Sequence, residues 1–278
     1  MDFSELEGKR MEMVTNHRLD EYCSRCRLEI AASAYVRLGR EWQGEKVCAS
    51  FSKLYFVESG SGWLRCGDSA VMLEPGNLYW IPPGVWVDFG CEEQLSKLYF
   101  HIQLLKPDRY DLLQGVGKIA SAPIPEGWLE ELLALQTDAA ITSALIRNQY
   151  LYRTLALLLP QFGLEGEKIT AYSENIRKCI AHVHANLRAD LRVSELAELC
   201  FVSTRYLTEL FVRELGVTPG RYIDDQLILE AQRRLSHSGD SVAGISEALG
   251  FADPFYFSRK FKNKCGITPL QYRKKTRT

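Results

Sequence analysis

The segment of residues 254–265, PFYFSRKFKNKC, combines four aromatic with four basic residues and is followed by Gly-Ile-Thr-Pro. At about 100° per residue on an α-helix, Phe257, Phe261 and Cys265 share one face. The side chains on the roughly opposite face are Phe255, Arg259, Lys262 and Asn263. The spacing predicts a helix that packs its aromatic face into a core and presents basic groups outward.

This pattern occurs twice in the chain. Residues 193–222 align with residues 242–272 at an offset of 49, which becomes 50 after a one-residue insertion in the turn. Leu207 then aligns with Phe257, and Phe211 with Phe261. Each unit reads as a short helix, a turn and a second helix, which is the helix-turn-helix arrangement whose second helix can enter a DNA major groove.

The outward side chains of the second helices have the chemistry that nucleic-acid recognition needs. In the first unit these are Arg205, Thr208, Glu209 and Arg213. Arginine reads guanine, hydroxyls donate or accept, and a carboxylate accepts from cytosine N4. Arg213, Lys262 and Asn263, further along the helices, suit phosphate contacts. One such helix would be interpreted as a solvated surface, but two spaced copies favour DNA reading.

A long helix is predicted between the two units. It begins at Thr218 as the N-cap, with Pro219 at the first helical position. We expect it to act as a rigid spacer that sets the distance between the two second helices.

The preceding half of the chain has a different organisation. Short runs rich in β-branched and aromatic residues lie at 53–59, 62–66, 70–73, 78–81, 85–89 and 97–104, separated by Gly, Pro and Ser turns. They predict an antiparallel sandwich or barrel. From 127 to 160 the apolar spacing becomes helical, which predicts two helices ended by Pro160. Their apolar stripe is either a dimer face or a surface that packs on the sheet.

Composition and charge agree with a two-part protein outside membranes. The 278 residues carry a net charge of −1, but residues 1–170 hold 17 Lys and Arg against 23 Asp and Glu, and residues 171–278 hold 17 against 12. The basic half could meet a polyanion. No apolar run is long enough to cross a bilayer and the first residues do not look like a signal peptide, so we expect a cytoplasmic protein.

Metal and redox chemistry have little support. The eight cysteines are scattered, and only Cys23 and Cys26 have a suggestive spacing, without a second ligand pair nearby. No metal site and no cofactor are expected. A redox role for the Cys23–Cys26 pair stays an open alternative.

The C-terminal hundred residues resemble the AraC/XylS family of bacterial transcription regulators. The resemblance is carried by Gly216-Val-Thr-Pro219 in the first unit and, more specifically, by Gly250-Phe251-Ala-Asp253, Tyr256-Phe257-Ser258-Arg259 and Gly266-Ile-Thr-Pro269 in the second. It implies two helix-turn-helix units that read successive major grooves, and RNA polymerase as a partner. The base-reading positions it implies are Arg205, Thr208, Glu209, Phe255, Ser258 and Arg259. Leu227, where the family usually has Arg, and Ser246, where it usually has Ala, depart from the pattern.

The N-terminal half resembles the cupin-like sensor domain of sugar-responsive regulators, through LYFVESGSGWL, LEPGNLYWIPPGVWVDF and LYFHI. Many cupins bind a metal through histidines, but the later His position falls on Val87 and residues 46–53 contain no His. His101 reads as a structural residue. An aromatic-rich pocket for a sugar or another small molecule is expected, with these candidate residues: Arg37, Trp42, Trp80, Phe89 and Lys97.

The sequence therefore predicts an α+β protein with an antiparallel cupin-like barrel followed by an all-α domain. The expected domains are 1–125 (sensor, with an N-terminal arm over roughly residues 1–30), 126–168 (helical dimerisation or linker segment) and 169–278 (DNA binding). The function expected is that of a homodimeric, effector-responsive regulator, with activation preferred and no enzymatic activity. Two alternatives remain: a cupin metalloenzyme with an accessory helical domain, and an effector-independent dimeric regulator.

Overall fold

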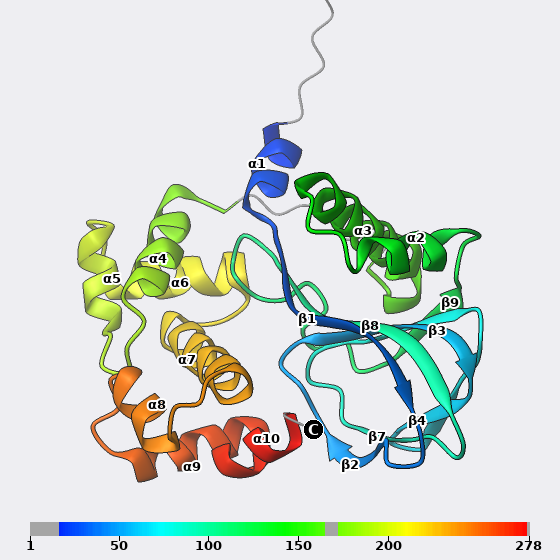
Figure 1. Ribbon diagram of the computed structural model, residues 1–278. Coiled ribbons are helices and arrows are strands. Elements are labelled where there is room, and N and C mark those ends of the chain that lie inside the picture. Colours follow the sequence, from blue (N-terminus) through cyan, green and yellow to red (C-terminus); the bar gives the residue numbers. More distant parts are fainter. Residues whose placement is uncertain (1–16, 165–171, 277–278) are drawn as a thin grey trace, which may run out of the picture.

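The computed structural model describes residues 17–164 and 172–276. A mostly β part and an all-α part lie next to each other (Figure 1). Helix α1 (His17–Arg25) precedes the first strand. Much of the arm expected over roughly residues 1–30 falls on residues 1–16, outside the described residues.

The β part consists of two antiparallel sheets. The first has the strand order β1 (Arg27–Leu38), β8 (Leu95–Leu105), β3 (Ser52–Gly60), β6 (Asn77–Ile81) and β9 (Ala120–Pro123). The second has the order β2 (Gln43–Val47), β7 (Val87–Gly90), β4 (Gly62–Cys66) and β5 (Ser69–Leu73). The predicted α+β class is confirmed, and the strands form two separate sheets rather than a closed barrel.

The long strands of the first sheet bury both faces, which explains why two layers cover that sheet. Side chains alternate along a strand, so Leu54, Phe56, Leu98 and Phe100 all point to one side. On that side lie α2 (Trp128–Leu135) and α3 (Ile141–Phe162) (Figure 1). The alternating residues point instead toward the second sheet.

The expected end of α3 at Pro160 is wrong by two residues. Pro160 lies inside the last turn, and the helix continues to Phe162 before Gly163 ends it in the left-handed conformation at φ 78°. Pro160 cannot donate to the Ala156 carbonyl and its ring crowds that carbonyl, and the helix ends within three residues, at Gly163.

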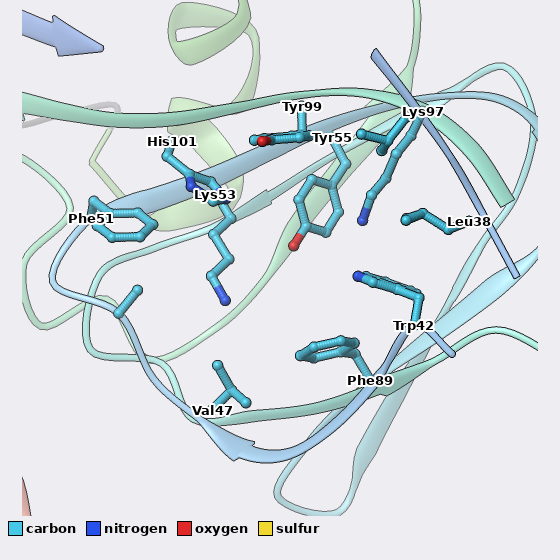
Figure 2. Close-up of a pocket in the computed structure, with 12 residues that line it drawn as sticks. Leu38, Trp42, Val47, Phe51, Lys53, Tyr55, Phe89, Lys97, Tyr99 and His101 are labelled. Carbon is cyan, nitrogen blue, oxygen red and sulfur yellow. The ribbon is translucent and has the colours of Figure 1, made fainter. Parts of the chain in front are cut away.

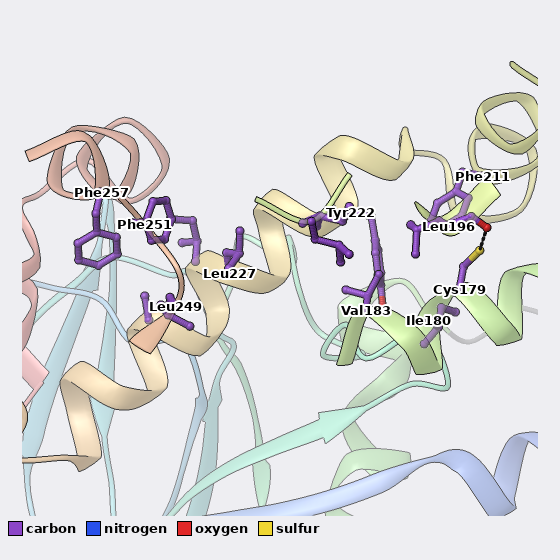
Figure 3. Packing of buried hydrophobic residues seen from close by; sticks show 14 of the residues in the cluster. Cys179, Ile180, Val183, Leu196, Phe211, Tyr222, Leu227, Leu249, Phe251 and Phe257 are labelled. Carbon is purple, nitrogen blue, oxygen red and sulfur yellow. Dashed lines mark hydrogen bonds between the residues drawn. The ribbon is translucent and has the colours of Figure 1, made fainter. Parts of the chain in front are cut away.

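The all-α part contains α4 (Glu174–Ala185), α5 (Val193–Leu199), α6 (Thr204–Leu215), α7 (Pro219–His237), α8 (Val242–Ala248), α9 (Pro254–Cys265) and α10 (Pro269–Thr276). The two predicted units are α5–α6 and α8–α9, and α7 is the predicted spacer. Figure 3 shows apolar residues of both units, including Phe211 and Phe257, in one core with Leu227 of α7. One continuous core therefore holds both units to the spacer helix.

Local capping fixes where each second helix begins and ends. The Ser203 hydroxyl accepts a hydrogen bond from the Tyr206 amide at 3.2 Å, and the Asp253 carboxylate accepts from the Phe255 amide at 2.8 Å. Gly216 and Gly266 end the two helices at φ 71° and 76°, a conformation that glycine adopts without strain. Thr218 caps α7 by accepting from the Arg221 amide, which confirms the predicted start of the spacer.

Candidate DNA-reading helices and effector cavity

The two predicted reading helices, α6 and α9, separate apolar from polar side chains as the sequence suggests. Leu207 and Phe211 of α6, and Phe257 and Phe261 of α9, are completely buried. The Arg205 side chain is 90 % exposed and pairs with Glu209 at 3.1 Å, one turn along α6. Because exposed ion pairs are weak, this contact leaves the guanidinium available to a stronger partner.

The remaining predicted DNA contacts also lie on these helices. Phe255 is 80 % exposed at the start of α9, and Arg259, Lys262 and Asn263 are exposed further along. Ser258 is half-buried. In α6, Thr208 is half-buried and its hydroxyl donates to the Thr204 carbonyl at 2.8 Å, while exposed Arg213 pairs with Glu214 at 3.2 Å. The base-reading and phosphate assignments stay predictions.

Two further lysines of α9 anchor this helix to the spacer helix α7. Lys260 pairs with Asp224 at 2.5 Å and Lys264 with Asp225 at 2.7 Å, both acids being on α7. Leu227 of α7 is fully buried, so the position that departs from the family pattern is part of the core. Two ion pairs and a continuous core restrict rotation of α9 about α7.

A cavity of about 240 Å³ lies between the two sheets (Figure 2). Its walls are the inward residues of β1, β3 and β8 on one side and β2, β7 and the adjacent loops on the other. The lining residues are Val36, Leu38, Trp42, Val47, Ala49, Phe51, Lys53, Tyr55, Phe89, Lys97, Tyr99 and His101. A partly open cavity lined by apolar and aromatic side chains with a few polar groups is typical of a small-molecule site.

The aromatic wall is closely packed. Trp42 and Phe89 have ring centroids 4.6 Å apart, and Trp42 and Tyr55 lie edge to face at 6.4 Å. Gly44 pairs with Phe89 in the β2–β7 register, and a Cβ at Gly44 would come within 2.7 Å of the Phe89 ring. The glycine therefore makes room for the ring that forms one side of the cavity.

Two lysines point into this space from neighbouring strands (Figure 2). Lys97 of β8 places its Nζ 3.7 Å from the Trp42 ring centroid and 3.5 Å from that of Tyr55. Lys53 of β3 lies 5.9 Å from the Phe89 ring centroid. Burial lowers the pKa of Lys53 to about 8. Burial, and then the charge of Lys53, lowers the pKa of Lys97 well below its usual value.

Three of the five predicted pocket residues line this cavity. Trp42, Phe89 and Lys97 line the cavity, but the structure does not bring Arg37 and Trp80 to it. Arg37 alternates with Val36 and Leu38 on β1 and stays exposed. Trp80 pairs with Leu54 and is buried on the helix-facing side of the sheet. In both cases the two-residue period of a strand sends the side chain to the other face.

Several lining residues were not predicted, and His101, interpreted as structural, is also part of the lining. A signal was present in the repeated sequence KLYF at 53–56 and 97–100. These two runs pair antiparallel, with Tyr55 opposite Tyr99 and Lys53 opposite His101. In both runs the lysine precedes an inward tyrosine by two residues, so it lies on the same face of its strand. This repeat could have identified Lys53 as a pocket residue.

The cavity strand β8 continues into a loop that contacts the helical part. Tyr222 of α7 donates to the Asp108 carbonyl at 2.9 Å, and Tyr172 donates to the Asp108 carboxylate at 2.8 Å. Tyr110 donates to Asp225 of α7 at 3.2 Å. Burial, followed by the charge of Asp225, raises the pKa of Tyr110. A displacement of β8 would thus reach the spacer helix through residues 106–111.

The cysteines and the possible metal ligands considered in the sequence analysis lie as follows. All eight cysteines are free thiols, with Cys23 exposed and Cys26 half-buried next to α1. Burial raises the pKa of Cys26. Within residues 17–164 and 172–276, no group of three or more metal-binding side chains is assembled, and no helix has the length and apolar character needed to span a membrane.

Comparison with known proteins covers both parts of the chain. Residues 45–198 match the family model of the AraC-like ligand binding domain, and residues 179–275 match that of a helix-turn-helix domain. The chain is 24 % identical over 234 residues to the Msm operon regulatory protein of Streptococcus mutans, covering 80 % of this chain and 83 % of that protein.

Two further relatives have names that refer to sugars. The raffinose operon transcriptional regulatory protein RafR of Pediococcus pentosaceus is 22 % identical over 244 residues, covering 84 % of this chain and 88 % of RafR. The lactose operon transcription activator of Staphylococcus xylosus is 25 % identical over 232 residues, covering 80 % of this chain and 83 % of the activator.

Proposed function

Because the chain belongs to the AraC family of transcription regulators with a ligand-binding domain, we propose that it binds a promoter as a homodimer and activates transcription when an effector occupies the cavity. The observation that carries this proposal is the presence, in one chain, of two helix-turn-helix units with exposed basic side chains and of a cavity lined in part by aromatic residues. In this proposal Arg205, Thr208, Glu209, Phe255, Ser258 and Arg259 read bases, and Arg213, Lys262 and Asn263 contact phosphates.

A rigid spacer supports reading of two successive grooves. Grooves on one face of B-DNA repeat about every 34 Å, so the two reading helices must keep a fixed separation. The buried residues of α7 and its ion pairs with α9 provide that stiffness. In this proposal the protein works in the cytoplasm and contacts RNA polymerase from the bound promoter.

The effector is proposed to be derived from a carbohydrate. The names of the raffinose and lactose operon relatives support this class, and the lactose relative supports activation. The Trp42 and Phe89 rings offer flat apolar faces against which the C–H face of a sugar can pack. A ligand changes the regulator only through different affinities for two states, and the β8 connection to α7 is the proposed link between cavity and DNA-reading helices.

Dimerisation is proposed through α3. Its face toward the sheet is buried, but Ile141 and Leu145 are 81 % and 64 % exposed and share one side of the helix with Tyr152. In a family of operon regulators, an exposed apolar row of this kind fits a dimer contact in which the same surface of two copies meets.

Replacing Leu145 by Glu is expected to convert the dimer into a monomer, because two acidic groups would face each other across a two-fold contact. Analytical ultracentrifugation of the full chain measures the change. The control is Leu270→Glu, which places the same charge on an exposed leucine of α10. A Leu145→Glu protein that sediments like the wild type would place the dimer contact elsewhere.

The proposed function is tested by footprinting the protein on its promoter and by thermal shift with a panel of sugars. A binder at 100 times its dissociation constant adds about 2.7 kcal/mol to the free energy of unfolding. A protected site with paired half-sites and a sugar-dependent shift is expected. Protection without any ligand shift would favour the effector-independent regulator, and stoichiometric bound metal with no protection would favour the metalloenzyme.

A further inference from the structure

Within residues 17–164 and 172–276, the lysines of the effector cavity have no anionic partner. Lys97 is only 2 % exposed, and the described residues that line the cavity include no Asp or Glu. Within the described residues, no ion pair or hydrogen bond joins Lys53 or Lys97 to a carboxylate. Both amines nevertheless point into the same cavity (Figure 2). A buried ammonium normally acquires a counter-ion or strong hydrogen-bond acceptors, since burial without them is costly.

Neighbouring aromatic rings stabilise the positive charges of the two amines to different degrees. Lys97 lies against the rings of Trp42 and Tyr55 at 3.7 and 3.5 Å, and such ring faces attract a cation. Among the described residues, the ring that faces Lys53 is that of Phe89, at 5.9 Å. With a pKa of about 8, the Lys53 amine is mostly charged at neutral pH. Lys53 is therefore the cation with the greater need for a partner, and its charge also disfavours the charged form of Lys97.

We propose that the effector carries an anionic group, a carboxylate or a phosphate, which pairs with Lys53 and accepts a hydrogen bond from Lys97 while the rest of the molecule packs on Trp42 and Phe89. This inference rests on the proposed effector role of the cavity. It narrows the carbohydrate class to sugar acids and sugar phosphates.

The surrounding groups are compatible with an anion. From β3 and β8 the cavity receives the Tyr55 and Tyr99 hydroxyls and the His101 ring besides the two lysines, and Cys48 lies next to Lys53. The second sheet contributes only Val47 and Phe89 to the lining. Burial, followed by the neighbouring Tyr99, raises the pKa of Tyr55, so this phenol stays neutral and can donate. The described lining therefore offers donors and positive charge and contains no competing carboxylate.

The first experiment uses simple anions, so it does not depend on knowing the effector. The melting temperature of the full chain is measured in acetate, in phosphate and in chloride at equal ionic strength, for wild type, Lys53→Met and Lys53→Arg. Acetate represents a carboxylate and phosphate a phosphoryl group. At least one of them is expected to raise the wild-type melting temperature above its value in chloride, with little effect on Lys53→Met and a partial effect on Lys53→Arg.

Two controls keep this test decisive. Lys118→Met removes an exposed lysine outside the cavity and should keep the wild-type response. Lys53→Met itself should be no less stable than wild type in chloride, because a half-buried charge without a carboxylate partner among the described residues has been removed. A large loss of stability would make Lys53 a structural residue and overturn the proposal, as would equal anion responses of wild type and Lys53→Met.

The response to acetate should also depend on pH. Acetate keeps its charge between about pH 7 and 9, whereas Lys53, with its pKa of about 8, loses its proton over this range. The acetate effect on the wild type is therefore expected to be present below this pKa and to disappear above it. If the effect is unchanged at high pH, another group holds the anion and the assignment to Lys53 falls.

The second experiment pairs neutral sugars with their anionic forms: glucose with glucuronate and glucose 6-phosphate, and galactose with galacturonate and galactose 6-phosphate. Isothermal titration of the full chain should show at least tenfold tighter binding of an anionic member, with the difference lost in Lys53→Met. Neutral sugars that bind as tightly as their acids would overturn the anion inference and leave the proposed function intact. A response to acetate or phosphate with no binding of any sugar derivative would support the anion site and overturn the carbohydrate class.

Discussion

Replacing Arg259 by alanine is expected to weaken binding to the cognate promoter site by about 1–3 kcal/mol, which is roughly 5- to 150-fold. The reason is that Arg259 is exposed on the reading helix α9, while the neighbouring Lys260 is already paired with Asp224. A guanidinium that forms two hydrogen bonds with one guanine discriminates that base pair from the other three. Fluorescence anisotropy with a duplex containing the protected site, and with three duplexes that change the contacted pair, measures the loss.

Two control variants show whether a loss of DNA affinity depends on the contacted base pair or occurs with every duplex. Lys262→Ala should weaken binding similarly on all four duplexes and reduce the salt dependence by about one ion, because a phosphate contact has no base preference. Arg65→Ala, which removes an exposed arginine of the second sheet, should bind like the wild type. If Arg259→Ala retains the wild-type preference among the four duplexes, Arg259 does not read that base pair.

Replacing Phe261 by alanine is expected to destabilise the helical domain by about 3–5 kcal/mol. Phe261 is completely buried on α9, 6.0 Å from the Phe257 ring and 5.4 Å from the Tyr272 ring. Truncation removes the apolar contact and leaves a cavity in a core that also holds the spacer helix, so relaxation around the site is restricted. Chemical unfolding of the full chain, followed by circular dichroism at a helical wavelength, measures the change.

The matched control is Phe255→Ala on the same helix. Phe255 is 80 % exposed, so its removal should change the free energy of unfolding by no more than about 0.5 kcal/mol. Its proposed role is instead an apolar contact with a base, such as a thymine methyl group, and DNA binding should weaken. Equal stability losses for the two variants would contradict the assignment of one face of α9 to the core and the other to DNA.

The helical half was predictable because its information is local and repeated. Ser203 and Asp253 as caps, Gly216 and Gly266 as helix ends, and the spacing of Phe257 with Phe261 all follow from interactions within about one helical turn. Because the helix-turn-helix unit occurs twice in the sequence, each position of the pattern could be compared with its counterpart in the other unit. The same patterns therefore predicted which side of α6 and α9 is buried.

The effector cavity was harder to predict because strand pairing is not local. The sequence indicated the strands, but Lys53 and Lys97 point into one cavity only because β3 and β8, which are distant in the chain, pair in this register. A shift of one residue in this pairing would turn one of the two lysines to the opposite face of the sheet. The same alternation explains why Trp80, an aromatic in the expected region, belongs to the core beneath α2 and α3.

By itself, the sequence determined the helix-turn-helix duplication, the rigid helix between the units and the antiparallel character of the sensor, because capping, helical periodicity and turn residues act between near neighbours. Only the tertiary structure decided that the two sheets stay open around a cavity, that two lysines point into this cavity with no carboxylate among its described lining residues, and that the loop after β8 contacts α7. These features depend on which distant segments pack together, and their energies arise from burial and register, which no short stretch of sequence contains.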